Sequence, residues 1–296
     1  MKRILVGRIA RRILAASTLL AAMQGAAWAA DVGGKLLLTG GVTQVEGAAG
    51  GGLTPWAVIG GYGDSNQIGG NASYTMVKTG DFRLDAWGAL VGINDRVELS
   101  WEQQEFNTLE AGAKLGLGQN FTFRQDVLGV KVRVAGDAIL EQDSWLPQIA
   151  VGVQQKTNNR GALVKLLGAK DSSGTDYYVS ATKLMLEQSL LLNGTVRMTK
   201  ANQLGILGFG GDRSNDYKAQ TELSAAYLVS KSWAVGAEYR SKPDNLKFAK
   251  EDDWYDLFVA WAPTKNVSAT LAYVNLGDIA TIKKQQGVYA SVQIGF

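Results

Sequence analysis

Hydrophobic and polar residues alternate along most of the chain after residue 65. From Val288 to Phe296, apolar side chains occupy every second position, and polar or small ones lie between them. Because successive side chains of a β-strand point to opposite faces, each such run predicts a strand with one apolar and one polar face. Further clear runs cover 96–102, 128–135, 233–240 and 267–273, and weaker ones lie near 67–78, 81–92, 147–157, 175–186, 189–200, 218–229 and 253–262.

The length and spacing of these runs predict a membrane barrel. Each run has about ten residues, which a tilted strand needs to cross the hydrocarbon layer of a bilayer. Short links near 93–95, 229–232 and 263–266 contrast with longer polar links near 107–125, 158–174, 201–217, 241–252 and 276–286. In lipid, an open sheet edge would leave a row of backbone groups unpaired. We therefore predict an all-β protein, a closed antiparallel transmembrane β-barrel of about twelve strands at residues 66–296.

The polar strand faces must then point into the barrel. Candidate lumen-lining residues are Arg96, Glu98, Glu102, Lys131, Arg133, Glu222, Glu238 and Arg240. These charges either set the selectivity of a pore or only fill and hydrate a narrow interior, and the pattern leaves both interpretations open. Phe296 is interpreted as a C-terminal assembly signal, because outer-membrane barrels commonly end on an aromatic residue that the barrel-assembly machinery reads.

Residues 1–29 have the pattern of a signal peptide. Basic residues come first, an apolar stretch covers about 13–27, and Ala27-Trp28-Ala29 offers small residues at alternate positions, so cleavage is expected before Ala30. An N-terminal anchor is the alternative, although the apolar stretch falls short of the ~20 residues that span a bilayer. With no later stretch of ~18 apolar residues, we predict export to the outer membrane of a Gram-negative bacterium, with a soluble periplasmic β-protein as the alternative.

The segment 30–65 is too rich in glycine for a lipid-facing strand. It either folds into the lumen as a plug or remains a flexible periplasmic leader. A phosphate-binding loop is disfavoured, because no Lys-Ser or Lys-Thr follows and Pro55 stands where a helix would begin. A short amphipathic helix is expected near Gly161–Ala169, with Leu163, Leu166 and Leu167 on one side.

The amino-acid composition excludes several kinds of catalytic and metal-binding site. The chain has no cysteine and no histidine, which excludes disulfides, thiolate or histidine metal sites and Ser-His-Asp catalysis. Without the five basic residues of the leader, the chain has 25 basic and 27 acidic residues and a net charge of −2. The basic pI therefore gives no reason to expect nucleic acid as a partner, and no cofactor or metal is expected.

Three functions fit an outer-membrane barrel whose partners are outer-membrane lipid and the assembly machinery. The first is a passive channel or transporter for a small solute, which the sequence does not identify. The second is a plugged structural or interaction barrel with partner-binding loops. The third, a membrane-embedded lipid-modifying enzyme, is disfavoured by the absence of histidine, so we expect no enzymatic activity.

Several long motifs resemble a known family. They are Gly40–Gly63 (above all Val45–Gly63), Arg83–Asp85, Gly88–Gly92 with Asp95–Ser100, Phe123–Val127 and Gly174–Tyr178. Together they resemble an uncharacterised domain-of-unknown-function family of Gram-negative outer-membrane-type envelope proteins. The resemblance covers nearly all of the chain after the leader. It implies an envelope location and brings no activity, ligand or catalytic residue.

Overall fold

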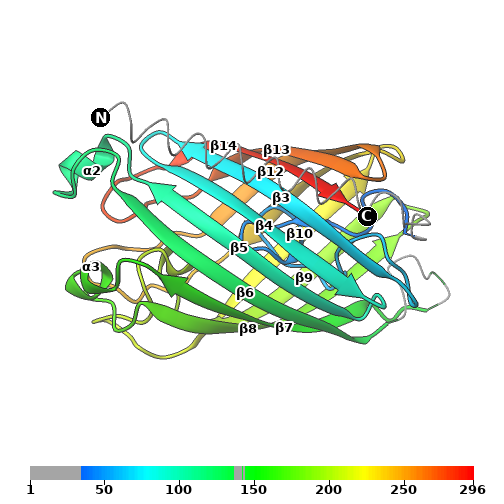
Figure 1. The fold of residues 1–296 in the computed structure, drawn as a ribbon, viewed down its shortest axis with the longest axis horizontal. Coiled ribbons are helices and arrows are strands. Elements are labelled where there is room, and N and C mark those ends of the chain that lie inside the picture. The colour runs from blue at the N-terminus through cyan, green and yellow to red at the C-terminus, as the bar shows by residue number, and fades with distance from the viewer. Residues whose placement is uncertain (1–34, 137–141, 143) are drawn as a thin grey trace.

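Twelve strands form one closed antiparallel barrel in the computed structural model, which describes residues 35–136, 142 and 144–296. The expected signal peptide lies outside the described residues. Each barrel strand pairs with its neighbours in chain order, and β14 closes the barrel by pairing with β3 (Figure 1). The predicted closed barrel of about twelve strands is confirmed.

The barrel strands are eight to fourteen residues long. They are β3 (Ile68–Thr79), β4 (Arg83–Ile93), β5 (Val97–Asn107), β6 (Thr122–Ala135), β7 (Gln148–Asn158), β8 (Ser173–Met185), β9 (Leu190–Thr199), β10 (Lys218–Leu228), β11 (Trp233–Arg240), β12 (Trp254–Thr264), β13 (Val267–Asn275) and β14 (Gln286–Gly295). The remaining elements are short: β1 (Val42–Thr43), β2 (Ala49–Gly50), α2 (Ala111–Lys114), α3 (Gly161–Leu166) and the 3-10 turn η1 (Gln203–Gly205).

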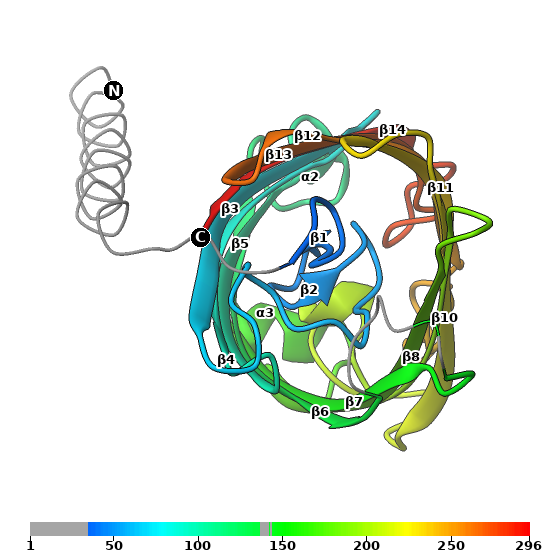
Figure 2. The same cartoon turned by 90° about the vertical axis from the view of Figure 1, so that its right-hand side faces the viewer.

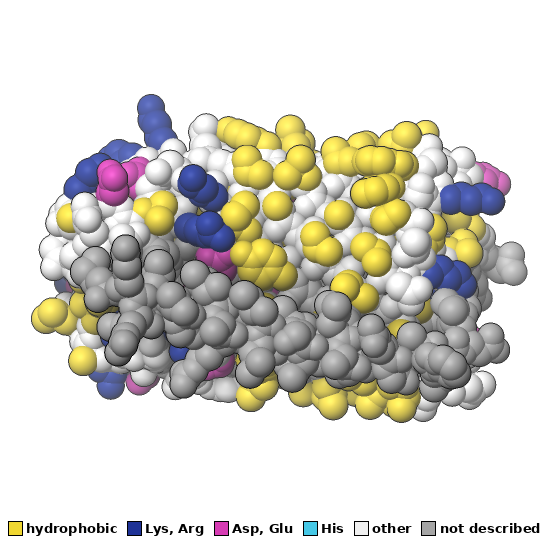
Figure 3. All heavy atoms as spheres, turned by 45° about the horizontal axis from the view of Figure 1, so that its top comes forward, with side chains coloured by type: hydrophobic (Ala, Val, Ile, Leu, Met, Phe, Trp, Pro, Cys, Tyr) yellow, Lys and Arg dark blue, Asp and Glu magenta, His cyan; other side chains and the backbone are white. Residues whose placement is uncertain are grey.

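Side chains alternate between the two faces of the wall as the pattern predicts. On β5, Leu99 is 47% exposed on the outside, whereas Glu98 is 1% exposed on the inside. The same contrast separates Val130 from Lys131 on β6. Apolar side chains consequently gather on the outer surface between the two ends of the barrel, where the strands lie (Figure 3).

The two ends of the barrel differ. The long-loop end carries the links 108–121, 159–172, 200–217, 241–253 and 276–285, whereas the short-turn end carries 94–96, 186–189, 229–232 and 265–266 (Figure 1). Two links depart from the expected alternation. The link 80–82 is short at the long-loop end, and the link 136–147 is longer than the others at the short-turn end.

Helix α3 forms within the expected range but packs a different face. Val164 is buried, and Leu163 and Leu167 pack beside it. Leu166 is 83% exposed, so the expectation that it shares the packed side is wrong. Over the described residues, no helix has the length and apolar character needed to cross a membrane.

An inner segment, which we define as Val42–Gly63, lies inside the barrel (Figure 2). All of its residues are buried. It begins with the β1–β2 hairpin, in which Val42 pairs with Gly50. Where it leaves the lumen, the Tyr62 backbone N–H donates to the carbonyl oxygen of Phe296 at 3.0 Å. The Gly-rich stretch is therefore packed within the wall formed by the later strands.

Candidate functional site

The inner segment passes so close to the wall that glycine is required. At Gly51, a Cβ atom would lie 2.0 Å from Glu238 Oε1. At Gly47, where the hairpin turns with a φ of +90°, a Cβ atom would lie 2.9 Å from the Cβ of Glu102. Glycine tolerates both the positive φ and the close approach. The richness in glycine thus reflects tight packing inside a barrel.

A buried ion cluster joins the tip of the inner segment to five wall strands. Glu46 contacts Lys156 on β7, lies 2.7 Å from Arg240 Nη1 on β11, and lies 3.5 Å from Arg197 Nη2 on β9. Asp176 on β8 pairs with Lys156 at 2.6 Å, and Glu222 on β10 pairs with Arg197 at 2.5 Å. These six residues, named the ion cluster below, carry three positive and three negative charges.

Glu46 remains ionised within this cluster. Burial by itself would raise the pKa of the Glu46 carboxyl, but Arg240, Lys156 and Arg197 together lower that pKa well below its usual range. Glu46 is also the only acidic residue between Val42 and Gly63. The inner segment therefore contributes a single, fixed negative charge to the cluster.

A second anchor is Glu238 on β11. Its carboxylate accepts hydrogen bonds from the Leu53 backbone N–H at 2.7 Å and from the Thr54 hydroxyl at 2.6 Å. Ser224 on β10 donates to the same carboxylate at 2.7 Å, and its hydroxyl oxygen lies 2.5 Å from that of Thr54. One acceptor group shared by backbone and side-chain donors fixes the position of this loop.

A third anchor lies nearer the short-turn end. Glu98 accepts hydrogen bonds from the backbone N–H groups of Ala49 at 3.0 Å and Gly60 at 2.8 Å. Lys131 on β6 pairs with Glu98 at 3.1 Å and donates to the Ala49 carbonyl at 2.9 Å. The wall therefore satisfies backbone groups that this irregular segment could not satisfy internally.

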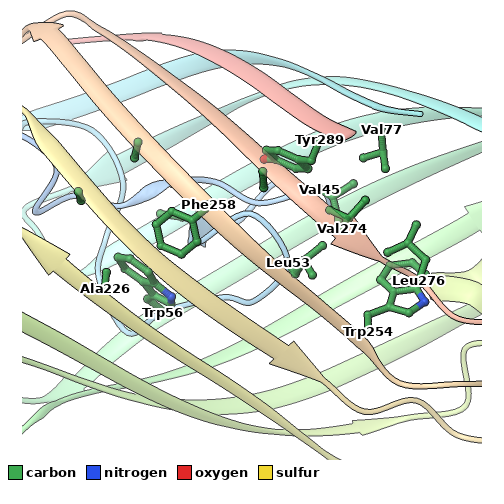
Figure 4. Close-up of a cluster of buried hydrophobic side chains, with 14 of the residues drawn as sticks. Val45, Leu53, Trp56, Val77, Ala226, Trp254, Phe258, Val274, Leu276 and Tyr289 are labelled. Carbon is green, nitrogen blue, oxygen red and sulfur yellow. The ribbon is translucent and has the colours of Figure 1, made fainter. Parts of the chain in front are cut away.

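The inner segment also contributes apolar side chains that pack against the wall. Leu53 and Trp56 belong to a cluster of buried side chains that includes Phe258 on β12 and Val274 on β13 (Figure 4). Trp56 is 5% exposed, and its indole N–H donates to Ser224 at 3.0 Å. The inner segment is thus held both by polar contacts and by apolar packing against the wall.

The structure places seven of the eight candidate lumen residues on the inner face. Glu98, Lys131 and Glu238 contact the inner segment directly, and Glu222 and Arg240 belong to the ion cluster. Arg133 instead pairs with Asp95 at 3.6 Å near the short-turn end. Glu102 is 1% exposed, and no hydrogen-bond partner of its carboxylate is found among the described residues.

Arg96 is the exception. It is exposed in the turn 94–96, because β5 begins one residue later at Val97. Phe296, the expected assembly signal, pairs through its backbone N–H with the carbonyl of Gly70 at 2.9 Å, beside the seam between β14 and β3.

Four members of the ion cluster were not among the sequence candidates. Lys156, Asp176 and Arg197 occupy polar-face positions of strands that the alternation predicts only weakly, so extending the pattern would have found them. Glu46 lies outside any strand pattern. Its signal is that it is the single acidic residue of a glycine-rich segment. Within the described part of the chain, no group of acidic residues has the arrangement of a metal site.

Comparisons with known proteins match this architecture. The model of a family described as "Protein of unknown function (DUF3034)" matches residues 39–293. No curated protein sequence matches the chain. The KdgM porin in complex with disordered oligogalacturonate is similar at a TM-score of 0.50 and 10% identity, over 76% of this chain and 99% of that chain.

Two further solved structures are less similar. The NanC porin has a TM-score of 0.49 and 12% identity, over 77% of this chain and 99% of that chain. The outer membrane phospholipase A from Escherichia coli has a TM-score of 0.43 and 11% identity, over 76% of this chain and 92% of that chain. At such low identity, the likeness to KdgM shows a shared barrel fold.

Proposed function

The chain belongs to the DUF3034 family of proteins of unknown function, and we propose that it is an outer-membrane channel for a small solute, closed at rest by its inner segment. The observation that carries this proposal is the ion cluster. Glu46 brings one charge to three wall cations from within the lumen. The segment is thus held by contacts that can be broken without unpairing any barrel strand.

The outer surface supports a membrane location. On β12 and β13, the exposed side chains of Leu257, Val259 and Leu271 lie between two groups of exposed aromatic residues. Tyr177, Tyr239, Tyr255 and Tyr273 lie toward the long-loop end, and Tyr227, Trp233 and Trp261 lie toward the short-turn end. Amphipathic rings at both borders of an apolar band are typical of barrels in a bilayer.

The burial of the lumen supports a closed resting state. Glu46, Glu98, Lys131 and Lys156 are each at most 1% exposed. A water-filled path along them would leave these side chains accessible to solvent. We therefore propose that solute passes only when the inner segment moves. This differs from the passive open pore, which the sequence pattern by itself also permits.

The proposal is tested by current measurements across a planar bilayer. A variant lacking residues 42–63 should conduct continuously, whereas the intact protein should open rarely. If the shortened variant inserts as a folded barrel and passes no current, the structural-barrel alternative is favoured and the channel proposal is wrong.

A cysteine pair tests the same idea in the full-length chain, which has no native cysteine. The Thr54 and Ser224 hydroxyl oxygens lie 2.5 Å apart, so the double variant Thr54→Cys/Ser224→Cys is placed to form a disulfide between segment and wall. Oxidation should abolish openings and reduction should restore them. Equal currents in both redox states would contradict a moving segment.

A further inference from the structure

An apolar cavity of about 200 Å³ lies between the inner segment and the long-loop end. Val45 and Leu53, at the tip of the inner segment, contribute to its lining. The wall contributes Phe106 and Trp254, and the loops contribute Leu204 and Ile279. The cavity therefore borders the part of the segment that the ion cluster and Glu238 hold in place.

The lining suits a ligand without polar groups. Eighteen of the twenty-two lining residues are apolar. Among the polar ones, the Thr79 hydroxyl donates to Gln285, the Thr108 hydroxyl donates to the Phe121 carbonyl, and the Gln203 amide donates to the Asp278 carbonyl. A saccharide here would lose its hydration without gaining matching partners, which is unfavourable for each buried hydroxyl.

The aromatic lining and the volume of the cavity favour a ligand with a single aromatic ring. Its lining includes Phe82 and Phe106, whose rings stack at 5.1 Å, and Phe123, whose ring centre lies 6.3 Å from that of Phe106. Aromatic rings prefer such offset and edge-to-face neighbours. An apolar protein cavity of about 150 Å³ is known to hold benzene, so this volume suits a ligand of that size or slightly larger.

The cavity is accessible from the long-loop end. Thr281 is exposed, and Leu117 and Phe248 are half-buried, so the lining reaches the surface among the loops. On the opposite side, Val45 and Leu53 directly adjoin the anchored residues Glu46 and Thr54. A ligand in the cavity would thus contact the segment beside two of its anchors.

We propose that this cavity binds a small apolar molecule, of the class of monocyclic aromatic hydrocarbons, as the substrate taken up from outside. The assignment of the bound molecule as a substrate rests on the proposed channel function. The binding itself depends only on the cavity.

The test is a titration of the full mature protein, in detergent micelles, with fluorobenzene followed by fluorine NMR. Leu276→Trp adds bulk at a buried lining position, and Leu257→Trp makes the same change at a position that is 62% exposed on the outer face. We expect saturable binding to the native protein and to Leu257→Trp, with at least about tenfold weaker binding to Leu276→Trp. Toluene should displace the probe, and a neutral disaccharide should not.

Equal signals from all three proteins, without saturation, would mean partition into the micelle and would overturn the inference. If Leu276→Trp does not fold, Val77→Phe adds bulk at another lining position on β3. Saturable binding together with a silent segment-deletion variant would retain the binding site and refute the channel. If saturable binding is absent and the deletion variant conducts, the channel proposal is retained and the binding site is refuted.

Discussion

Replacing Glu46 with glutamine should release the inner segment from the wall. The change keeps the shape of the side chain and removes the only acidic group between Val42 and Gly63. Lys156, Arg197 and Arg240 would then face two carboxylates in a volume where each of these side chains is at most 4% exposed. The docked state would carry one uncompensated buried positive charge, whereas water can hydrate these cations once the segment leaves.

The expected magnitude follows from this imbalance. Removing one partner of a buried ion pair costs about 3–5 kcal/mol. Because about 1.4 kcal/mol corresponds to a tenfold change in an equilibrium, the ratio of displaced to docked segment should rise by about two to three and a half orders of magnitude. The anchors at Glu98 and Glu238 remain, so the barrel itself should keep its stability.

The assay is the open probability of single channels in a planar bilayer. Glu187→Gln is the matched control, because it makes the same chemical change at an exposed position in the short turn 186–189. Folding and insertion are checked by heat-modifiable migration on a gel. A folded, inserted Glu46→Gln protein with the open probability of the control would refute the idea that the ion cluster holds the segment closed.

Three further outcomes are expected. Gly51→Ala should raise the open probability, because the new Cβ atom would lie 2.0 Å from Glu238 Oε1. The control Gly80→Ala, whose Cβ atom would have no neighbour within 4 Å, should leave the open probability unchanged. Equal open probabilities in the two variants would contradict the close fit of the segment at Gly51. Leu257→Arg places a charge on the outer face and should lower the free energy of unfolding in liposomes by about 2–4 kcal/mol, measured by urea titration; an unchanged midpoint would argue against lipid at that face. Docking lowers the pKa of Glu46, so the charge stabilises the docked state above the ordinary glutamate pKa of ~4.3 and is lost only as pH falls through the lowered pKa. Single-channel recording should therefore show the native protein still closed at pH ~5, and opening between neutral pH and that value would contradict this linkage.

The barrel could be predicted from the sequence because its rule is local. Lipid outside and polar contacts inside impose a period of two, and the pair Leu99 and Glu98 shows that rule residue by residue. The alternation predicts the side of the wall only for residues within a strand, and it fails at strand ends. Arg96 lies one residue before its strand begins, and its side chain is exposed in the turn.

The position of the inner segment could not be predicted from the sequence, because it depends on contacts between residues that are far apart in the chain. The inner segment shows neither the period of a strand nor that of a helix, and distant residues fix its position. Glu46, for example, contacts Lys156 and Arg240, which lie 110 and 194 positions away. The packed face of α3 is set in the same way, since Val164 is covered by Ile206 and Leu207 from another loop. The amphipathic pattern does not include these contacts, and it therefore placed Leu166 on the packed side of α3 incorrectly.

The junction at Phe296 has a consequence for the order of assembly. The carbonyl of Phe296 accepts hydrogen bonds from the backbone N–H groups of Tyr62 and Gly70, where the inner segment meets the first barrel strand. Tyr62 and Gly70 can thus reach these final contacts only after Phe296 has been synthesised. Contacts this distant in sequence form late and slowly. The contact between Tyr62 and Phe296 should accordingly form late in biogenesis, and the inner segment would lack this hydrogen bond to the wall until β14 has been made.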